Sequence, residues 1–435
     1  MAMNIDKSYV RVIGGGLAGT EASLLLARLG IKVKLIDMKP SKLSKAHHDK
    51  DHLAELVCSN SLKSEDPLSA PGILKGEMER LGSVVIEASK IAKVPSGQDL
   101  AVDRDVFSKY ITDAIKSNKN IEIVDEDVQS IPDDGILTIV CTGPLTSDGL
   151  SNFLAEKIGK SMLSFFDAAA PLIFKSSIDT SRMFEGSRYG KGEGKYLNIP
   201  MSKEQYEKFN NELINAQRAI LHDFDHFEGC LPLEVMTKRG PMTLRYGPLK
   251  TVGLNCPSDT YAVVQLRQDD VAGSLYSPVG FQTNLTFPEQ KRVFGLIPGL
   301  ENAKYARFGL MHRNTYVNAP SCLDRTLRLK NDPNIYIAGQ LSGVEGYCES
   351  AAMGLLAACY VYQRLSNDKV EYIPVNTLMG SLANYLVMSS PNHFAPMNAT
   401  FGIIATTHSR KDHQLLRDES LGKLDEWVKK NLHIQ

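Results

Sequence analysis

The stretch that decides the fold is Tyr9-Val-Arg-Val-Ile-Gly-Gly-Gly-Leu-Ala-Gly-Thr-Glu-Ala-Ser-Leu-Leu-Leu-Ala-Arg-Leu-Gly30. A short run rich in valine and isoleucine leads into the turn Gly14-x-Gly16-x-x-Gly19, and an apolar helix follows. A second apolar run over 31–36 ends at Asp37. Strand, glycine turn, helix, strand and acid in this order are typical of a dinucleotide site.

Each residue of the turn has a predicted task at that site. Gly14 permits the tight turn, Gly16 lets the backbone approach a pyrophosphate, and Gly19 lets the helix pack closely on the strand. Free N–H groups at the helix N-terminus face the phosphates, and Asp37 accepts a hydrogen bond from a ribose hydroxyl. The predicted contacts in this part of the chain are Gly14, Gly15, Gly16, Leu17, Ala18, Gly19 and Asp37. The alternative is a glycine turn with a structural role alone.

Composition is that of an ordinary globular protein. The 435 residues are 43% hydrophobic and 23% charged, with a net charge of −1, so no bulk field draws the chain to nucleic acid or membrane. The N-terminal stretch lacks the apolar core of a signal peptide, and no run approaches a membrane span. A cytoplasmic protein is predicted. Seven cysteines without a Cys-x-x-Cys pair argue against a disulfide framework or a zinc ribbon.

The pattern of predicted strands and helices changes twice along the chain. Residues 1–145 alternate strands and helices, whereas 146–325 mix turns with short β-like runs around one long helix, expected at 202–219. The order of strand, glycine turn and helix appears again near residue 334. We predict an α/β fold, a two-part Rossmann-like FAD-binding domain of 1–145 plus 326–435 with an inserted α+β domain of 146–325. The expected strands of the insertion are 171–174, 231–236, 243–246, 261–266 and 279–285.

The late glycine turn favours FAD over a nicotinamide cofactor. A buried strand reaches Gly339, a turn through Gln340 and Gly343 follows, and a helix of small residues starts near Glu349. In two-part FAD proteins the first glycine turn takes the pyrophosphate and a late one takes the ribityl–flavin end, where a helix N-terminus stabilises a reduced flavin. Gly143, which ends another buried strand, is added to the predicted contacts. The alternative is that the late helix is only core packing. Any NADPH or NADH must dock transiently, because no second complete unit exists.

Ordered motifs along nearly the whole chain carry a family resemblance. They are Val12–Ala22, Ala54–Leu62, Leu100–Arg104, Thr142–Thr146, Phe166–Pro171, Phe227–Met236, Val264–Asp270, Met311–Thr315, Gly343–Tyr347 and Pro396–Ala399. With these the chain resembles the folate- and FAD-dependent uracil-5-methyltransferases known as TrmFO, relatives of the longer flavoprotein GidA. The resemblance implies methylation at C5 of a uridine in RNA, most simply uridine 54 in the T-loop of tRNA. The carbon comes from 5,10-methylenetetrahydrofolate, and FAD reduced by NADPH or NADH carries the methylene and supplies the hydride.

This chemistry requires a reactive cysteine. A thiolate adds at C6 of uracil, C5 becomes nucleophilic, and a second group removes the C5 proton. Cys58 lies in a polar loop and Cys230 on a turn of the insertion, whereas Cys141 and Cys359 fit the core and Cys348 stays possible. The family implicates both Cys58 and Cys230. We assign Cys230 as the C6 nucleophile and place Cys58 at the flavin, handling the methylene or the C5 proton, and the reverse division stays open.

Other polar residues are assigned to ligands without a metal. His47, His48 and His52 lack a partner set for a metal, so contacts to phosphate or folate are predicted for them. Basic side chains suit RNA phosphate or the folate glutamate, the alternative being a solvated face. The candidates are Lys238, Arg239, Arg245 and the stretch His312–Asn314.

Three further functions compete. A GidA-like enzyme modifying a wobble uridine needs a partner GTPase and a C-terminal extension for which we see no length, and no obligate protein partner is inferred. A thiol–disulfide flavoprotein needs a redox cysteine pair that the sequence lacks. A flavin-binding RNA chaperone needs no catalytic cysteine. The same methylation chemistry on a 23S rRNA uridine is the alternative substrate.

Overall fold

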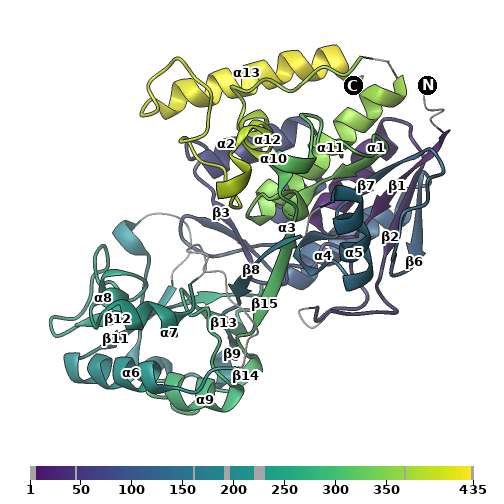
Figure 1. Cartoon of the computed structure of the whole chain (residues 1–435). Coiled ribbons are helices and arrows are strands. Elements are labelled where there is room, and N and C mark those ends of the chain that lie inside the picture. The colour runs from purple at the N-terminus through teal and green to yellow at the C-terminus, as the bar shows by residue number, and fades with distance from the viewer. Residues whose placement is uncertain are drawn as a thin grey trace.

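The chain forms two lobes joined by a narrow waist (Figure 1). The computed structural model describes residues 6–44, 47–159, 162–190, 196–219, 231–366 and 369–432. Both ends of the chain build the upper lobe, and its middle builds the lower lobe. Among the helices of these ranges, none is long and apolar enough to cross a membrane.

A five-stranded parallel sheet forms the centre of the upper lobe. Its order is β16-β7-β1-β2-β6, so β1 lies in the middle with β2 on one side and β7 on the other. Every residue of β7 and β16 is buried, and so are the last four residues of β1, as expected of a parallel sheet covered on both faces. The predicted α/β class is therefore confirmed. The strands are Asp6–Ile13 (β1), Val33–Asp37 (β2), Ile121–Asp125 (β6), Ile136–Val140 (β7) and Ile335–Ile337 (β16).

Two helices cross on this sheet and start at the two predicted glycine turns. Helix α1 spans Leu17–Arg28 and α11 spans Tyr347–Ser366. They pack backbone to backbone, because a Cβ at Gly354 would overlap the carbonyl oxygen of Ala18. Their N-termini are thereby brought to the same edge of the sheet. Five further helices surround them: Ala70–Arg80 (α2), Val84–Ile91 (α3), Arg104–Ser117 (α4), Asp148–Ile158 (α5) and Leu378–Met388 (α12), with His413–Asn431 (α13) lying over α2 at the top.

The lower lobe is a six-stranded antiparallel sheet in the order β10-β11-β12-β13-β9-β14. Helices Lys203–Asn215 (α6) and Phe287–Phe294 (α9) pack beside each other on it, with Phe209, Phe281 and Phe294 meeting in the core. The α6 helix ends before residue 219, at a turn through Ala216. The strands are Leu172–Phe174 (β9), Phe184–Gly186 (β10), Tyr196–Met201 (β11), Ala262–Gln268 (β12), Leu275–Pro278 (β13) and Tyr305–Arg307 (β14).

Three of the strands expected in this lobe are wrong. Residues Leu233–Met236 and Thr243–Tyr246 form single helical turns, α7 and α8, and β13 ends at Pro278 before the third run. Pro232 starts the first of these turns and Gly247 ends the second. Apolar runs this short cannot be assigned by periodicity.

The waist consists of a two-stranded sheet that runs between the lobes, and a small sheet of the upper lobe adjoins it. Strands Leu163–Ala168 (β8) and Met311–Tyr316 (β15) pair antiparallel and run between the lobes (Figure 1). In the upper lobe, strands Ser61–Ser64 (β3), Lys93–Val94 (β4) and Asp99–Val102 (β5) form a second small sheet. The hydroxyl of Tyr196 in the lower lobe donates to the carbonyl of Ser96, 2.8 Å away. The domain boundaries at 145 and 326 stay a prediction.

One buried carboxylate holds three helices of the upper lobe together. Glu77 on α2 accepts hydrogen bonds from the backbone N–H groups of Leu378 and Met379 at 2.7 and 2.8 Å, and so caps the N-terminus of α12. It also accepts from the hydroxyl of Ser420 on α13. Burial raises the pKa of Glu77 to about 7, since the charged form has lost its water, although these donors oppose the shift.

The unfolding free energy of the protein is therefore expected to depend on pH through the titration of Glu77. A carboxyl whose pKa is raised on folding contributes stability below pH 4.5 that is lost as the pH rises through 7. Relative to Glu77→Gln, which does not titrate, the unfolding free energy of the wild type should fall by about 3 kcal/mol between pH 4.5 and 8. Urea unfolding of both proteins across that range measures the difference. Parallel pH profiles would contradict this assignment.

Candidate active site

The first glycine turn lies at the edge of the parallel sheet, where β1 meets α1. Gly14 has φ +103°, and a Cβ there would lie 2.6 Å from the carbonyl oxygen of Cys141 on the neighbouring chain segment. A Cβ at Gly19 would overlap the carbonyl oxygen of Gly14, so helix and turn touch directly. Gly16 caps α1, and nothing lies within 4 Å of the place its Cβ would take. The turn is thus closed on its inner side and open at Gly16.

Asp37 at the end of β2 is tied to the same turn. Its Oδ2 accepts from the N–H of Gly15 at 2.5 Å, and its Oδ1 accepts from the N–H of Lys39 at 2.9 Å. A carboxylate offers about four lone-pair positions, so these two bonds leave acceptor capacity for a ribose hydroxyl. The contacts fix the acid beside the glycine turn.

An open cavity lies in front of the turn, with about 930 Å³ of empty space when the adjoining solvent is included. Its walls come from the ends of β1, β2 and β7 and from both glycine turns. Val57 and Tyr347 line it near the waist. Of the predicted cofactor contacts, eight line this cavity: Gly14, Gly16, Leu17, Ala18, Asp37, Gly143, Gly339 and Gln340.

The other three predicted contacts lie behind the cavity wall. Gly15 holds Asp37, and Gly19 packs on Gly14. Gly343 ends the short helical turn Gly339–Ser342 with φ +99°, and a Cβ there would lie 2.5 Å from the ring of Phe394. These glycines shape the walls and do not face the space.

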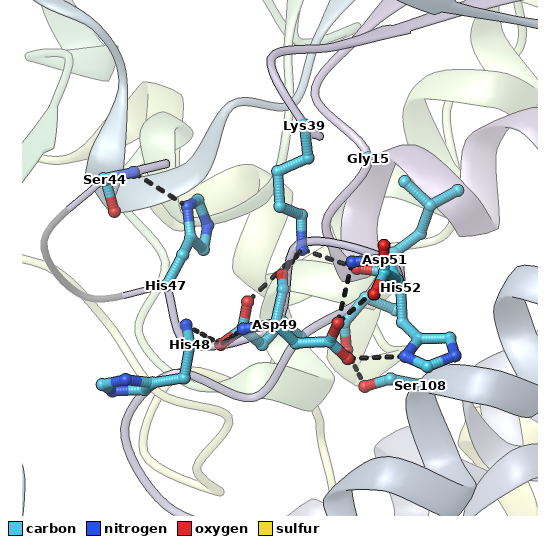
Figure 2. Close-up of polar contacts among 12 residues, drawn as sticks. Gly15, Lys39, Ser44, His47, His48, Asp49, Asp51, His52 and Ser108 are labelled. Atoms are coloured by element: carbon cyan, nitrogen blue, oxygen red, sulfur yellow. Dashed lines mark hydrogen bonds and ion pairs between the residues drawn. The ribbon is translucent and has the colours of Figure 1, made fainter. Parts of the chain in front are cut away.

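A long loop after β2 forms one side of the cavity, and Figure 2 shows the polar contacts within it. Lys39 reaches into it and donates to the carbonyls of Asp49 and His52 at 3.0 and 2.5 Å. Its Nζ also lies 3.3 Å from Glu55 Oε2, and both side chains are less than a tenth exposed. Glu55 Oε1 in turn accepts from the N–H of His48 at 2.7 Å. This buried ion pair, which the sequence reading missed, organises the loop from within.

The loop histidines have separate surroundings. His47 lines the cavity, and burial lowers its pKa, so its ring is neutral near pH 7. His52 is paired with Asp49, with 2.6 Å between Nδ1 and Oδ2 (Figure 2). Within the described ranges, no three His, Cys, Asp or Glu side chains gather as metal ligands. The loop is fastened to the turn because the N–H of Ala54 donates to the carbonyl of Gly15 at 2.8 Å.

Cys58 follows this loop at the cavity edge, next to Val57. The hydroxyl of Tyr347 accepts from the N–H groups of Cys58 and Ser59 at 2.9 and 3.2 Å. The sulfur lies 4.0 Å from the carbonyl oxygen of Ala168 on β8, and the residue is half-buried. Cys58 therefore stands where the cavity, the N-terminus of α11 and the waist meet. Cys230 lies outside the described residues.

Two arginines approach Cys58 from the other side. The carbonyl of Cys58 accepts from Arg307 Nη2 at 3.2 Å and from Arg104 Nη2 at 3.4 Å. Arg104 also pairs with Asp269 of the lower lobe. Arg307 has a pKa lowered to about 10, first by burial and then by the charge of Arg104. The charge of Cys58 acts on the Arg307 guanidinium, so this arginine favours the thiolate form of the cysteine.

Removal of one guanidinium should slow reactions of Cys58. In Arg307→Met, the rate of alkylation of Cys58 by iodoacetamide at pH 7 is expected to fall roughly tenfold, because less thiolate is present. Peptide mapping of quenched time points follows Cys58 alone. Arg307→Lys should keep most of the rate, and Arg182→Met, on the exposed pair with Glu301, should keep all of it. An unchanged rate in Arg307→Met would rule out this electrostatic effect.

The remaining predicted residues divide into core and surface. Cys141, Cys348 and Cys359 are buried, and Cys322 is buried at the end of the short helix Ala319–Cys322. Asn314 is buried on β15, so it cannot reach RNA from the surface. The side chains of His312 and Arg313 lie outside the described residues. Lys238 and Arg239 are exposed and Arg245 is half-buried, all in the lower lobe.

Several known proteins that are similar to this chain over most of its length share one name. The family model described as glucose inhibited division protein A matches residues 9–369. The methylenetetrahydrofolate–tRNA-(uracil-5-)-methyltransferase TrmFO of Acetivibrio thermocellus is 53% identical over 403 residues, which cover 91% of this chain and 92% of that protein. The protein of that name from Lactobacillus acidophilus is 49% identical over 96% of this chain and 97% of its own length.

Solved structures agree at the level of the fold. A crystal structure of Aquifex aeolicus GidA superposes with a TM-score of 0.73, covering 98% of this chain and 74% of that one at 18% identity. That likeness extends over both lobes of the present chain. Together with the identities above, it leaves one assignment: the chain belongs to the TrmFO family of methylenetetrahydrofolate–tRNA-(uracil-5-)-methyltransferases, within the wider GidA group.

Proposed function

We propose that the chain transfers a one-carbon unit from methylenetetrahydrofolate to C5 of a uridine in tRNA, with FAD bound in the upper-lobe cavity. The observation that carries the proposal is the place of Cys58, at the edge of a cavity walled by two glycine turns, in a chain 53% identical to a named enzyme of this activity. We propose uridine 54 of the T-loop as the target and NADPH or NADH as the reductant. The cytoplasm, which holds tRNA and folate, is the proposed location.

The residues of the cavity fit FAD. The open face at Gly16 admits a pyrophosphate against the N-terminus of α1, whose N–H groups have no helical acceptor. Asp37 has free acceptor positions for a ribose. Gly339 and Gln340 also line the cavity, with Gly339 beside Ala18 and both close to the start of α11, where the flavin ring would lie. Bound there, FAD would supply the one-carbon carrier and the hydride.

The protein's part in the reaction is acid–base and nucleophilic. We assign Cys230 to attack at C6 of the uracil, which makes C5 nucleophilic, and Cys58 to receive the C5 proton after the carbon has been transferred. For this the Cys58 sulfur must be a thiolate, which Arg307 favours. Tyr347 and the arginines hold its backbone from both sides, so the sulfur is presented in a fixed position at the cavity edge.

Label transfer to defined RNAs tests the proposal. Purified protein, NADPH and methylene-labelled methylenetetrahydrofolate are incubated with an unmodified tRNA transcript or with a 23S rRNA fragment, and the label is mapped by nuclease digestion. Label at the T-loop uridine supports the full proposal. Label on the rRNA fragment alone would keep the chemistry and replace the substrate. Absence of label from both RNAs, with a protein that is yellow and reducible, would refute the methyltransferase proposal.

A further inference from the structure

A basic surface on the lower lobe stands apart from the active site. We define it as the exposed side chains of Lys238, Arg239, Tyr246, Lys250 and Val252 with the adjoining pair Arg188–Tyr189. No acidic residue occurs from 235 to 258, although the whole chain carries 50 acids against 49 basic residues. Figure 1 shows α8, at the centre of this segment, on the side of the lower lobe away from α9.

The surface is built rigidly. Leu244 and Leu249 are fully buried and anchor the segment in the core. Between them Arg245 lies 4.4 Å from the ring centroid of Tyr261 and 5.3 Å from that of Tyr246, and its Nε donates to the Tyr261 carbonyl at 3.1 Å. One face of Tyr246 therefore rests on a guanidinium, while 71% of the residue is exposed.

A second exposed tyrosine is fixed to the same segment. Arg188 donates to the carbonyls of Val252 and Lys250 at 2.6 and 2.8 Å. Tyr189 follows it with a positive φ of 58°, its N–H donates to the Gly253 carbonyl at 2.5 Å, and its ring lies against Gly253. The residue is 65% exposed. Strain of this kind in a non-glycine residue persists only where the surroundings hold it. The contacts of the loop therefore fix the exposed ring of Tyr189 in place.

The surface continues towards the waist. Ser187, directly before Arg188, lies beside Gly97 of the upper lobe, and Tyr196 bonds Ser96 in the same loop. That loop leads through β5 to Arg104, which contacts Cys58. The loop at Ser96 and Gly97 thus contacts the edge of the basic surface and is followed in the chain by the strand that leads to the active-site edge.

We propose that the basic surface is where the RNA substrate docks outside the reacting nucleotide, an inference that rests on the proposed function. Exposed lysine and arginine side chains bind a phosphate backbone and release its counterions. Exposed tyrosines stack on unpaired bases, as RNA-binding surfaces use them.

Binding of a fluorescein-labelled unmodified tRNA transcript, followed by anisotropy at several KCl concentrations, tests the inference. Lys238→Ala/Lys250→Ala should weaken binding roughly tenfold at 0.15 M salt and lower the slope of log Kd against log salt by roughly 1.5. Tyr246→Ala should weaken binding several-fold with an unchanged slope, and Tyr246→Phe should restore it, because stacking needs the ring alone.

The matched control removes two exposed lysines elsewhere. Lys423→Ala/Lys429→Ala on α13 changes the net charge equally and should bind as the wild type does. Equal weakening in both double variants, or wild-type binding in Lys238→Ala/Lys250→Ala, would overturn the docking surface while the wild type still methylates the transcript. A wild type that neither binds nor methylates the transcript would instead refute the proposed function, and selective capture of a protein partner by this surface in place of tRNA would also overturn the inference.

Discussion

Cys58→Ala is expected to incorporate at least ~10³-fold less labelled carbon into tRNA than the wild type, because removal of a group that handles a reacting proton or bond costs this much or more. The fold should survive, since the residue is half-buried and the contacts of its backbone to Tyr347, Arg104 and Arg307 do not involve the sulfur. Label incorporation under single-turnover conditions, with FAD content measured from the visible spectrum, gives the result.

Two further variants define the role of the sulfur. Cys58→Ser keeps the size of the side chain and should be as inactive as Cys58→Ala, because a hydroxyl is not ionised at neutral pH. Cys256→Ala, at a half-buried cysteine of the lower lobe, should retain most of the activity. If Cys58→Ala methylates tRNA within tenfold of the wild type, Cys58 has no part in the chemistry.

Gly354→Ala is expected to destabilise the protein by at least ~3 kcal/mol, although alanine normally favours a helix. A Cβ at this position overlaps the Ala18 carbonyl, so α11 must move away from α1 along a fully buried contact. Separation of these helices would also displace both glycine turns that wall the cavity, and FAD content should fall with stability. Thermal unfolding and the visible spectrum measure the two effects.

The same substitution on α13 provides the control. Gly422 is helical, exposed, and has open space where its Cβ would lie. Gly422→Ala should therefore stabilise by roughly 0.5–1 kcal/mol. A Gly354→Ala protein as stable as the wild type would show that the two helices are not held by backbone contact.

Local patterns allowed the upper lobe to be predicted well. Alternation of buried apolar runs with glycine turns indicates parallel strands and helices because each signal is complete within about twenty residues. The capping of α4 by Asp103, which accepts from the N–H groups of Asp105 and Val106, is of this kind. The single-turn helices α7 and α8 are predicted as strands because a stretch of four residues is too short to distinguish the helical from the strand periodicity.

The contacts around Cys58 show why the site itself was only partly predictable. Arg307 is 249 residues from Cys58 in sequence, and Tyr347 is 289 residues away. Nothing in the sequence near Arg307 marks it, because its environment is created by the return of the chain through the waist. The Lys39–Glu55 pair is closer in sequence but lies in a loop without periodicity, where no pattern links a lysine to the carboxylate it will meet.

The placement of β16 beside β7 has a consequence for biosynthesis. The core of the lower lobe draws on residues 170–305, whereas the parallel sheet needs strands separated by about two hundred residues. During synthesis the lower lobe can fold while one edge of β7 is still unpaired. Closing so long a loop is slow, and an open apolar edge invites pairing with another chain. The upper lobe is thus prone to aggregation while it is being synthesised. This interval ends only when residues 335–337 have left the ribosome.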